Sequence, residues 1–317
     1  MKILIVRFSS IGDIVLTTPV IRCLKSQIPD CEIHYFTKQA YVGLLDNNPH
    51  ISKVWVLSDD IKPVLSELKQ EGFDYILDLH NNLRTKRVSL RLGVETKRLD
   101  KLNIQKWLLV RFHKNTMPDK HIVDRYLDVA QKFNVKNDDK GLDYFIPSDT
   151  KIDVSLPNQY ICYAIGGQHN TKKMPLTKMI DLCNELQHKV VVIGGKEDND
   201  IGSKLADACS EVINLCGRIS IHQSALVMRG STSVITHDTG MMHIASALKK
   251  KVLSIWGNTV PSLGMYPYLP DPASKIFEVE GLSCRPCSKI GFDTCPKGHF
   301  DCMQLQDTKA IALTTET

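Results

Sequence analysis

Short apolar runs alternate with amphipathic stretches along most of this 317-residue chain, and that alternation restricts its fold more than any other feature. Strands separated by helices favour parallel βαβ units, so we predict an α/β protein. The predicted strands are residues 3–6, 32–36, 54–56, 75–79, 160–165, 189–193, 212–214, 233–236 and 252–256.

The predicted strands fall into two series, which a polar stretch bounded by prolines separates at residues 146–158. We interpret this stretch as a linker, because the chain is too long for one typical core and fits two domains of about 150 residues. We therefore expect one domain at residues 1–150 and another at 151–317. Each would be a Rossmann-like doubly wound sheet, with a cleft between the two domains.

Composition and charge narrow the class of protein. Hydrophobic residues make up 43% of the chain and charged residues 24%, as in ordinary globular proteins. The first apolar stretch, Ile3–Val6, is shorter than the about 7 to 15 residues of a signal-peptide core, and no run approaches the roughly 18 residues of a membrane span. We therefore expect a cytoplasmic protein.

The net charge of +5 is unevenly distributed, because residues 84–120 hold eleven Lys or Arg and three acidic residues. That excess favours either an acidic partner or a solvated helix face.

An Asp238-Thr239-Gly240 turn joins the predicted strand 233–236 to a helix-like run. The same tripeptide carries the catalytic carboxylate of aspartic proteases, but those enzymes need two such carboxylates and this chain has one copy. Between a strand and a helix, the turn instead directs backbone N–H groups and the positive end of the helix dipole at an anion such as a diphosphate.

Two further strand ends in the same half carry paired glycines followed by charged residues. Glycine lets a ligand approach the backbone closely, and lysine reaches phosphate oxygens. With the Asp238 turn, these ends predict a nucleotide-diphosphate pocket, although the chain has neither a dehydrogenase nor a P-loop fingerprint. The residues are Gly166, Gly167, Lys172 and Lys173 at one strand end, and Gly194, Gly195 and Glu197 at the other.

In the first half, the opening strand runs into Ser9-Ser10-Ile11-Gly12-Asp13 and then into a helical run. Gly12 permits a tight turn, and Asp13 falls at the helix start. Asp13 either complements the helix dipole or acts as a general base at the carboxyl end of a strand, where open α/β sheets bind ligands. The local sequence leaves both roles open.

Four segments, taken in order, resemble glycosyltransferase family 9, the ADP-heptose:lipopolysaccharide heptosyltransferases. The resemblance covers about residues 1–305. The segments are Ser9-Ser10-Ile11-Gly12-Asp13, Asp78-Leu79-His80-Asn81-Asn82-Leu83-Arg84, Lys172-Lys173-Met174-Pro175 and Asp238-Thr239-Gly240-Met241-Met242-His243.

The resemblance implies a GT-B fold of two facing Rossmann-like domains, with the acceptor on the first and the nucleotide sugar on the second. It implies inverting, metal-independent transfer of a heptose from ADP-heptose to a lipopolysaccharide inner-core acceptor, with Asp13 as the base. Lys172, rather than Lys173, would bind phosphate. The implied donor-binding residues are Gly166, Gly167, Lys172, Lys173, Glu197, Asp238, Thr239, Gly240 and His243. The implied acceptor-binding residues are Ser10, Gly12, Asn81, Arg84 and Arg87.

The implied partners are therefore a nucleotide sugar and an acidic core acceptor at the inner membrane, with no nucleic acid and no cofactor for catalysis. The basic residues after Arg84 suit such an acceptor. A transferase using another nucleotide sugar or acceptor, a nucleotide-sugar epimerase or hydrolase, and a non-catalytic nucleotide-binding protein are the alternatives.

Three details bear on metal and specificity. Asp198-Asn199-Asp200 has the spacing by which some glycosyltransferases hold a metal, but it lies where a helix should begin, so we interpret its acids as dipole partners. The family usually has Gly-Pro-Thr-Asp-Pro where this chain has residues 257–261, Gly-Asn-Thr-Val-Pro, and the Met241-Met242 pair is also unusual.

Ten cysteines are many for a cytosolic chain. Six of them are scattered in apolar or helical segments, where we interpret them as small buried hydrophobic residues. The other four are predicted either to hold a structural zinc ion, with His299 as a substitute ligand, or to remain free or redox-active thiols. They are Cys284, Cys287, Cys295 and Cys302, spaced C-x2-C-x7-C-x6-C.

Overall fold

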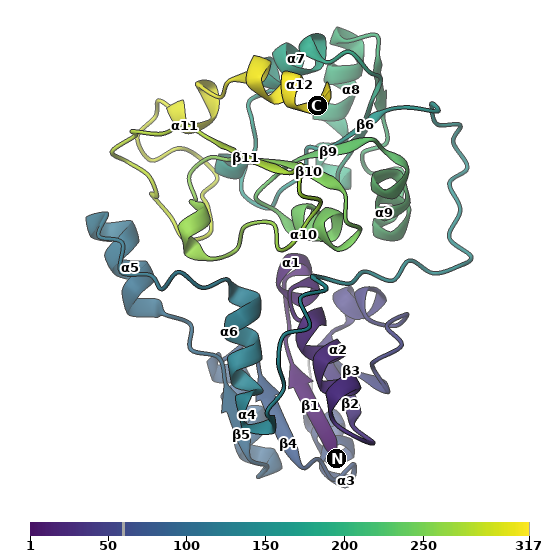
Figure 1. The fold of residues 1–317 in the computed structure, drawn as a ribbon, viewed down its shortest axis with the longest axis vertical. Coiled ribbons are helices and arrows are strands. Elements are labelled where there is room, and N and C mark those ends of the chain that lie inside the picture. Colours follow the sequence, from purple (N-terminus) through teal and green to yellow (C-terminus); the bar gives the residue numbers. More distant parts are fainter. Residues whose placement is uncertain (59–60, 317) are drawn as a thin grey trace. The chain divides into compact units, whose positions relative to one another are not determined.

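The computed structural model describes residues 1–58 and 61–316 (Figure 1). The chain divides into two compact units. Unit 1 comprises residues 1–102 and 120–145, and unit 2 comprises residues 103–119 and 146–317. Each unit has its own parallel β-sheet covered by helices, so each is described separately below.

Unit 1 contains a five-stranded sheet in which every strand pairs in parallel, in the order β3-β2-β1-β4-β5. β1 lies at the centre, with Ile3 beside Ile33 of β2 and Tyr75 of β4. Four of its five residues are buried, which explains its continuous apolar sequence. The strands are β1 (Lys2–Val6), β2 (Glu32–Lys38), β3 (Lys53–Leu57), β4 (Tyr75–Asp78) and β5 (Thr96–Arg98).

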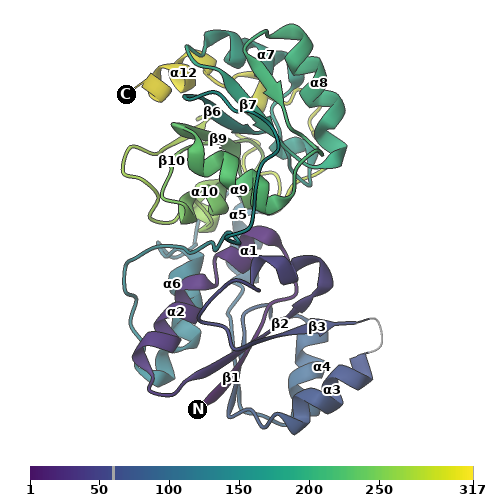
Figure 2. The same cartoon turned by 90° about the vertical axis from the view of Figure 1, so that its right-hand side faces the viewer.

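Helices cover both faces of this sheet: α2 packs with α6 on one face, and α3 packs with α4 on the other (Figure 2). α4 shows how the local sequence sets a boundary, because Asn82 caps its N-terminus by accepting from the Thr85 N–H, and Gly93 ends it in the left-handed conformation. The helices are α1 (Ile11–Val15), α2 (Thr18–Gln27), α3 (Ile61–Gln70), α4 (Leu83–Leu92) and α6 (Ile122–Val129), with 3₁₀ turns η1 (Gln39–Leu44) and η2 (Gln131–Phe133).

Unit 2 contains a six-stranded parallel sheet in the order β11-β10-β9-β6-β7-β8. The interior strands β6, β7 and β9 are buried along their whole length. The strands are β6 (Ile161–Ala164), β7 (Val190–Ile193), β8 (Val212–Asn214), β9 (Ser233–His237), β10 (Lys251–Trp256) and β11 (Lys275–Glu278).

The helices of unit 2 also form two layers, with α7, α8 and α12 on one face of the sheet and α9 and α10 on the other (Figures 1 and 2). They are α5 (Asn103–Phe112), α7 (Leu176–Glu185), α8 (Asn199–Ala208), α9 (Ile221–Gly230), α10 (Gly240–Ala247), α11 (Asp301–Gln304) and α12 (Thr308–Glu316). The 3₁₀ turns are η3 (Asn170–Lys172), η4 (Lys196–Asp198) and η5 (Pro261–Leu263).

The structure confirms all the predicted strands and the α/β class, and it adds two strands, β5 and β11. Both added strands lie at sheet edges. β5 is only Thr96, Lys97 and Arg98, and charged residues are typical of protected edges, so its sequence carries no apolar signal.

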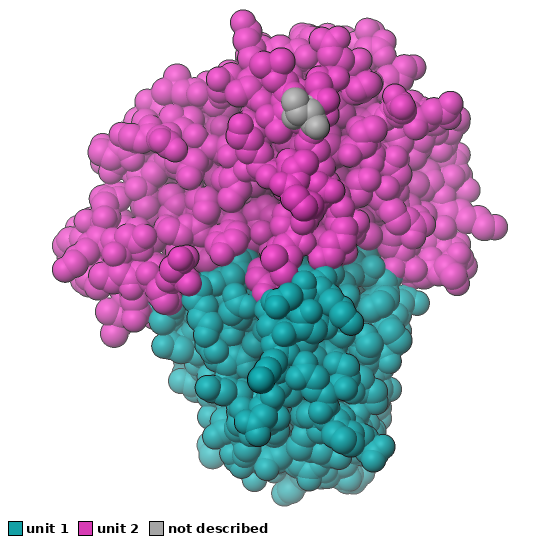
Figure 3. Space-filling model, viewed as in Figure 1, with its two compact units in different colours: residues 1–102, 120–145 teal, residues 103–119, 146–317 magenta. Residues whose placement is uncertain are grey.

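Residues 103–119 are the main difference from the expected division at residue 150. This segment, which includes α5, groups with unit 2 although it lies in the first half of the sequence (Figure 3). None of the helices described within residues 1–58 and 61–316 is long and apolar enough to cross a membrane.

Both sheets reverse their strand order at one point, between β1 and β4 in unit 1 and between β6 and β9 in unit 2. Open α/β sheets bind ligands beyond the carboxyl ends of the strands at such a point. The loops after these four strands contain most of the residues singled out in the sequence.

Candidate functional site

Asp13 lies in the first turn of α1, directly after the loop that follows β1. Its Oδ2 accepts hydrogen bonds from the Ser10 backbone N–H at 3.2 Å and from the Ser10 hydroxyl at 2.9 Å. Its Oδ1 lies 2.7 Å from Arg7 Nη2. The carboxylate is therefore held in one orientation, with about a fifth of its side chain (19%) exposed to solvent.

Arg7 holds this arrangement together. Its side chain donates to the carbonyls of Ser9 (2.6 Å) and Leu79 (2.7 Å), and it also contacts the Tyr126 hydroxyl at 3.2 Å. Burial alone would lower the pKa of Arg7, but Tyr126 and Asp13 outweigh that effect and the pKa is raised. Arg7 thus remains a cation beside Asp13 and joins the loops after β1 and β4. The sequence did not reveal this role.

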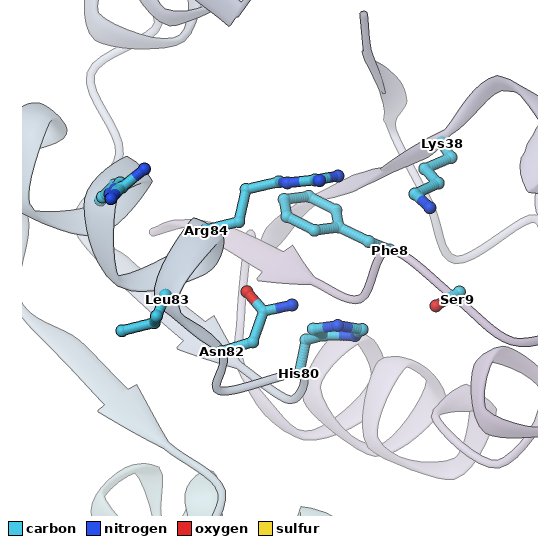
Figure 4. Close-up of a pocket in the computed structure, with 8 residues that line it drawn as sticks. Phe8, Ser9, Lys38, His80, Asn82, Leu83 and Arg84 are labelled. Atoms are coloured by element: carbon cyan, nitrogen blue, oxygen red, sulfur yellow. The ribbon is translucent and has the colours of Figure 1, made fainter. Parts of the chain in front are cut away.

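A pocket of about 540 Å³ opens at the carboxyl ends of β1, β2 and β4 (Figure 4). Two of the predicted acceptor-binding residues, Arg84 and Arg87, line it. The close-up shows the Arg84 side chain extending past the Phe8 ring, with Lys38 across the opening. The lining residues are Phe8, Ser9, Lys38, His80, Asn82, Leu83, Arg84 and Arg87. This set gives the pocket a cationic rim suited to an anionic ligand.

His80 contributes a neutral imidazole to this pocket. Burial, and then the positive charges of Arg7 and Lys101, lower its pKa to about 4. At neutral pH the ring is therefore uncharged, with one nitrogen that can donate a hydrogen bond and one that can accept.

The other predicted acceptor-binding residues do not line this pocket. Ser10 caps α1, and Gly12 is buried within it. Asn81 donates from Nδ2 to the Leu99 carbonyl at 2.7 Å, which ties the loop after β4 to the chain after β5. Its backbone also has a φ of 44°, in the left-handed region where asparagine is tolerated better than most residues. These three residues shape the loops around the pocket.

In unit 2, the Asp238-Thr239-Gly240 turn joins β9 to α10 as the sequence predicted. Asp238 Oδ2 lies 2.6 Å from Lys172 Nζ and accepts a hydrogen bond of 2.7 Å from the Thr259 hydroxyl. Thr239 is the N-cap of α10, but its side chain makes no capping hydrogen bond. The first amides of α10 therefore lack a side-chain cap, as at helix ends that bind anions.

Close packing leaves little room for a side chain at the two glycines after β6. A Cβ atom on Gly166 would lie 2.6 Å from Asp198 Oδ2, and one on Gly167 would lie 3.2 Å from Thr239 Cγ2 and 3.3 Å from Lys173 Cγ. The turns after β6, β7 and β9 therefore meet at one edge of the sheet. This confirms that the three strand ends lie together.

The Asp198-Asn199-Asp200 sequence does not form a paired-carboxylate site. Asp198 is buried, accepts from the Gly195 N–H at 2.9 Å and lies 3.2 Å from Lys173 Nζ. Asp200 is exposed and pairs instead with Lys204 at 2.7 Å. The structure thus agrees with the helix-start interpretation, and it shows that Lys173 is held by Asp198.

Two other predicted donor-binding residues lie near this edge. His243 is buried in the first half of α10, whereas Glu197 is exposed in η4, next to Gly195. The sequence did not single out His237, the last residue of β9. Its Nε2 accepts from the Met174 N–H at 3.1 Å, which fastens the chain after Lys173 to β9. Burial, and then the charge of Lys173, lower the pKa of His237 to about 3, so it is neutral.

Arg285 fastens the loop after β10. Its guanidinium donates to the carbonyls of Gly257 (2.5 Å), Val279 (2.7 Å) and Thr259 (3.0 Å), and it pairs with Glu278 at 2.8 Å. Thr259 in turn donates to Asp238. The cysteine-rich segment is therefore connected to the Asp238 turn through one buried arginine.

The four clustered cysteines form no disulfide. Burial, and then the neighbouring thiols of Cys284 and Cys295, raise the pKa of Cys287, so these sulfurs lie near one another. Among the described residues, however, no three of the cysteine sulfurs and His299 come within 4.8 Å of one another. In this arrangement they do not form the closed tetrahedral site that structural zinc needs.

One group of metal-type ligands is closer together, Glu32, His34 and Glu71. Lys2 Nζ already lies 2.6 Å from Glu71 and 3.6 Å from Glu32. Trp55 donates to His34 Nδ1 at 2.9 Å, so the proton of the neutral ring is on Nε2, which faces Glu32 at 2.8 Å. This group is an internally satisfied ion-pair network.

Comparisons with known proteins agree with this fold. Lipopolysaccharide heptosyltransferase 1 of Campylobacter coli is 23% identical over 295 residues, which covers 82% of this chain and 84% of that protein. The solved structure of Escherichia coli ADP-heptose LPS heptosyltransferase II matches with a TM-score of 0.69 at 18% identity, over 100% of both chains. E. coli heptosyltransferase WaaC with ADP-2-deoxy-2-fluoro heptose matches with a TM-score of 0.65 at 19% identity, over 82% of this chain and 90% of that one.

These structural matches confirm two Rossmann-like units of the GT-B type. The family model described as "Glycosyltransferase family 9 (heptosyltransferase)" matches residues 63–291, which is more than half of the chain. The chain therefore belongs to glycosyltransferase family 9, and it is a glycosyltransferase.

Proposed function

We propose that this protein transfers a heptose from ADP-heptose to a lipopolysaccharide inner-core acceptor. The turn between β9 and α10 is the observation that carries the donor assignment. There, Lys172 Nζ lies 2.6 Å from Asp238, beside the uncapped start of α10 and the glycines after β6. A lysine, helix amides and an approachable backbone are the groups that bind a diphosphate.

In this proposal unit 1 supplies the acceptor site and the base. Asp13 accepts the proton of an acceptor hydroxyl as that oxygen attacks the anomeric carbon of the heptose. Arg84 and Arg87 bind anionic groups of the acceptor in the pocket beside the loop after β1. Lys172 and the first amides of α10 stabilise the negative charge that develops on the leaving ADP. The donor-binding roles of Gly166, Gly167, Lys173, Glu197, Asp238, Thr239, Gly240 and His243 belong to the same proposal.

The stereochemistry follows from a single displacement. If the acceptor oxygen attacks the face opposite to the leaving diphosphate, the anomeric configuration inverts. Lys172 and the helix amides supply the charge that a divalent cation would otherwise provide, so we propose that transfer needs no metal. NMR of the purified product would show the inverted configuration, and transfer would persist in EDTA. Retention, or loss of transfer that Mg²⁺ restores, would contradict this part.

The direct test is a transfer assay with ADP-heptose and a heptose-deficient inner-core acceptor, read by product mass. We expect one heptose added per acceptor, with release of ADP only when acceptor is present. Formation of an isomerised sugar nucleotide without acceptor would indicate an epimerase, and acceptor-independent release of ADP would indicate a hydrolase.

Donor preference needs a separate measurement, because the loop after β10 departs from the usual family sequence at Asn258 and Val260. Ligands that bind the folded state raise its thermal stability in proportion to saturation. We expect ADP-heptose to stabilise the protein more than UDP- or GDP-sugars. A larger shift with a different nucleotide sugar would reassign the donor.

We propose a structural role for the cysteine cluster, either as thiols that pack the loop or as ligands of zinc after the sulfurs draw together. Metal analysis of the purified protein, together with thiol titration, distinguishes the two. One zinc per chain, with all four sulfurs unreactive until the metal is removed, would show the zinc site. No metal, and ready reaction of the partly exposed Cys284, Cys287 and Cys295, would show free thiols.

A further inference from the structure

Helix α5 presents an unusual set of exposed apolar side chains. Ile104 is 72% exposed, Trp107 57% and Phe112 59%, while Leu109 is the buried residue of this helix. The rings of Trp107 and Phe112 meet edge to face, with centroids 5.1 Å apart. Figure 1 shows α5 standing apart from the sheet layers of its unit. Neighbouring exposed aromatic residues of this kind mark a binding surface.

The charge around α5 has one sign. Residues 103–118, which hold α5 in unit 2, contain three basic residues and no acidic residue. Arg111 and Lys114 are exposed, next to the aromatic pair. The basic residues are Lys106, Arg111 and Lys114.

The helix is also fastened to the rest of unit 2. His113, directly after α5, donates from Nδ1 to the Arg285 carbonyl at 3.1 Å. At the end of the helix itself, the Lys114 N–H donates to the Leu108 carbonyl at 3.3 Å. The end of α5 is therefore connected to the segment of unit 2 that carries Arg285.

We propose that α5 docks this protein on an anionic phospholipid bilayer, with Trp107, Ile104 and Phe112 entering the headgroup boundary and the exposed Arg111 and Lys114 facing lipid phosphates. Tryptophan and phenylalanine favour such a boundary, and each basic side chain near an anionic surface strengthens binding about fivefold. A second copy of the chain fits this face less well, because two copies of α5 would bring like charges together. The proposal rests on the proposed function, whose acceptor is a membrane lipid.

The chain contains its own reporter for this contact. Of its three tryptophans, Trp55 and Trp256 are buried, with 5% and 1% exposed. A change in tryptophan emission on adding vesicles therefore reports on Trp107. With vesicles of phosphatidylethanolamine and phosphatidylglycerol we expect a blue shift and quenching by brominated lipid, both reversed by high salt. With phosphatidylcholine vesicles we expect neither. An unchanged emission with anionic vesicles would overturn the proposal.

Substitutions with a matched control localise the contact. In vesicle co-sedimentation we expect Trp107→Ser to weaken binding by about tenfold or more, and Arg111→Glu by about fivefold or more. The control is α12, which carries an exposed leucine and an exposed lysine: Leu313→Ser and Lys309→Glu should leave binding unchanged. Equal binding by the α5 variants and the parent would overturn the proposal. If light scattering shows that the parent is a dimer and Trp107→Ser is a monomer, α5 would be assigned to self-association instead.

Activity assays separate this inference from the proposed function. The α5 variants should match the parent on a deacylated, water-soluble acceptor and be slower on acceptor embedded in anionic vesicles. If the parent transfers heptose to neither acceptor, the proposed function fails while the vesicle result still stands by itself. If the parent transfers to both and the α5 variants lose nothing on vesicles, the docking proposal fails alone.

Discussion

The buried side chain of Arg285 offers the sharpest test of how the loop after β10 is held. Its guanidinium donates to three backbone carbonyls and pairs with Glu278, and its side chain is only 6% exposed. Arg285→Met keeps a long apolar stem but removes every donor. The carbonyls of Gly257, Val279 and Thr259 would then lose their charged partner.

The expected cost follows from these contacts. Hydrogen bonds to charged groups contribute about 1.5–3 kcal/mol each, but water and loop relaxation recover part of the loss, and the partly exposed Glu278 adds little. We therefore expect Arg285→Met to lower the free energy of unfolding of unit 2 by about 3–5 kcal/mol. Because Thr259 also holds Asp238, we expect ADP affinity to fall by about tenfold.

Urea unfolding followed by the emission of Trp256 measures this change. Trp256 ends β10, next to Gly257, and it becomes the sole tryptophan once Trp55 and Trp107 are replaced by Phe. Arg229→Met is the control. Arg229 is exposed near the end of α9, which leads into the start of β9, so it lies at the amino ends of the strands, whereas the loop after β10 lies at their carboxyl ends. If Arg285→Met unfolds at the same urea concentration as Arg229→Met, the bracing role of Arg285 is wrong.

Three further predictions follow from the site. Lys172→Met should lower both stability and ADP affinity, because it leaves the Asp238 carboxylate without its ion-pair partner. Adding Asp238→Asn should restore stability without restoring ADP affinity. Recovery of both would show that Lys172 serves only its ion pair. The pKa of His237 is lowered to about 3 in the folded state, so its contribution to the free energy of unfolding is full above the unfolded pKa of about 6.5 and is lost as pH falls toward 3. Between pH 7 and 5, urea titrations should show the parent losing about 2 kcal/mol more of its free energy of unfolding than His237→Gln. An equal loss in both proteins would refute this. Arg87→Ala should raise the KM for acceptor and leave ADP binding unchanged, whereas the exposed Arg91 outside the pocket should tolerate the same change; equal effects would remove Arg87 from the acceptor site.

The sequence predicted the central strands well because buried parallel strands are continuous apolar runs, as in Val190–Ile193. It could not predict β5, whose residues Thr96, Lys97 and Arg98 resemble any polar loop. The groups of site residues at the carboxyl ends of the strands, one in each unit, were also predictable, since glycines and charged residues follow these strands directly.

The supporting residues of those groups were not predictable, because their partners are distant in the sequence. Arg7 contacts Leu79 and Tyr126, and His237 accepts from Met174. Arg285 lies between two of the clustered cysteines and donates to the Gly257 carbonyl, a contact that the local sequence does not indicate. Only the folded chain brings these groups together.

The most direct test of the proposed mechanism is the transfer rate of Asp13→Asn under saturating ADP-heptose and acceptor, with ADP affinity measured on the same protein. Asparagine keeps an oxygen that can accept from Ser10 but cannot take a proton from the acceptor hydroxyl. We predict that the rate falls by about 10²–10⁴-fold while ADP affinity is unchanged. A rate equal to that of the parent would contradict the role of Asp13 as the general base.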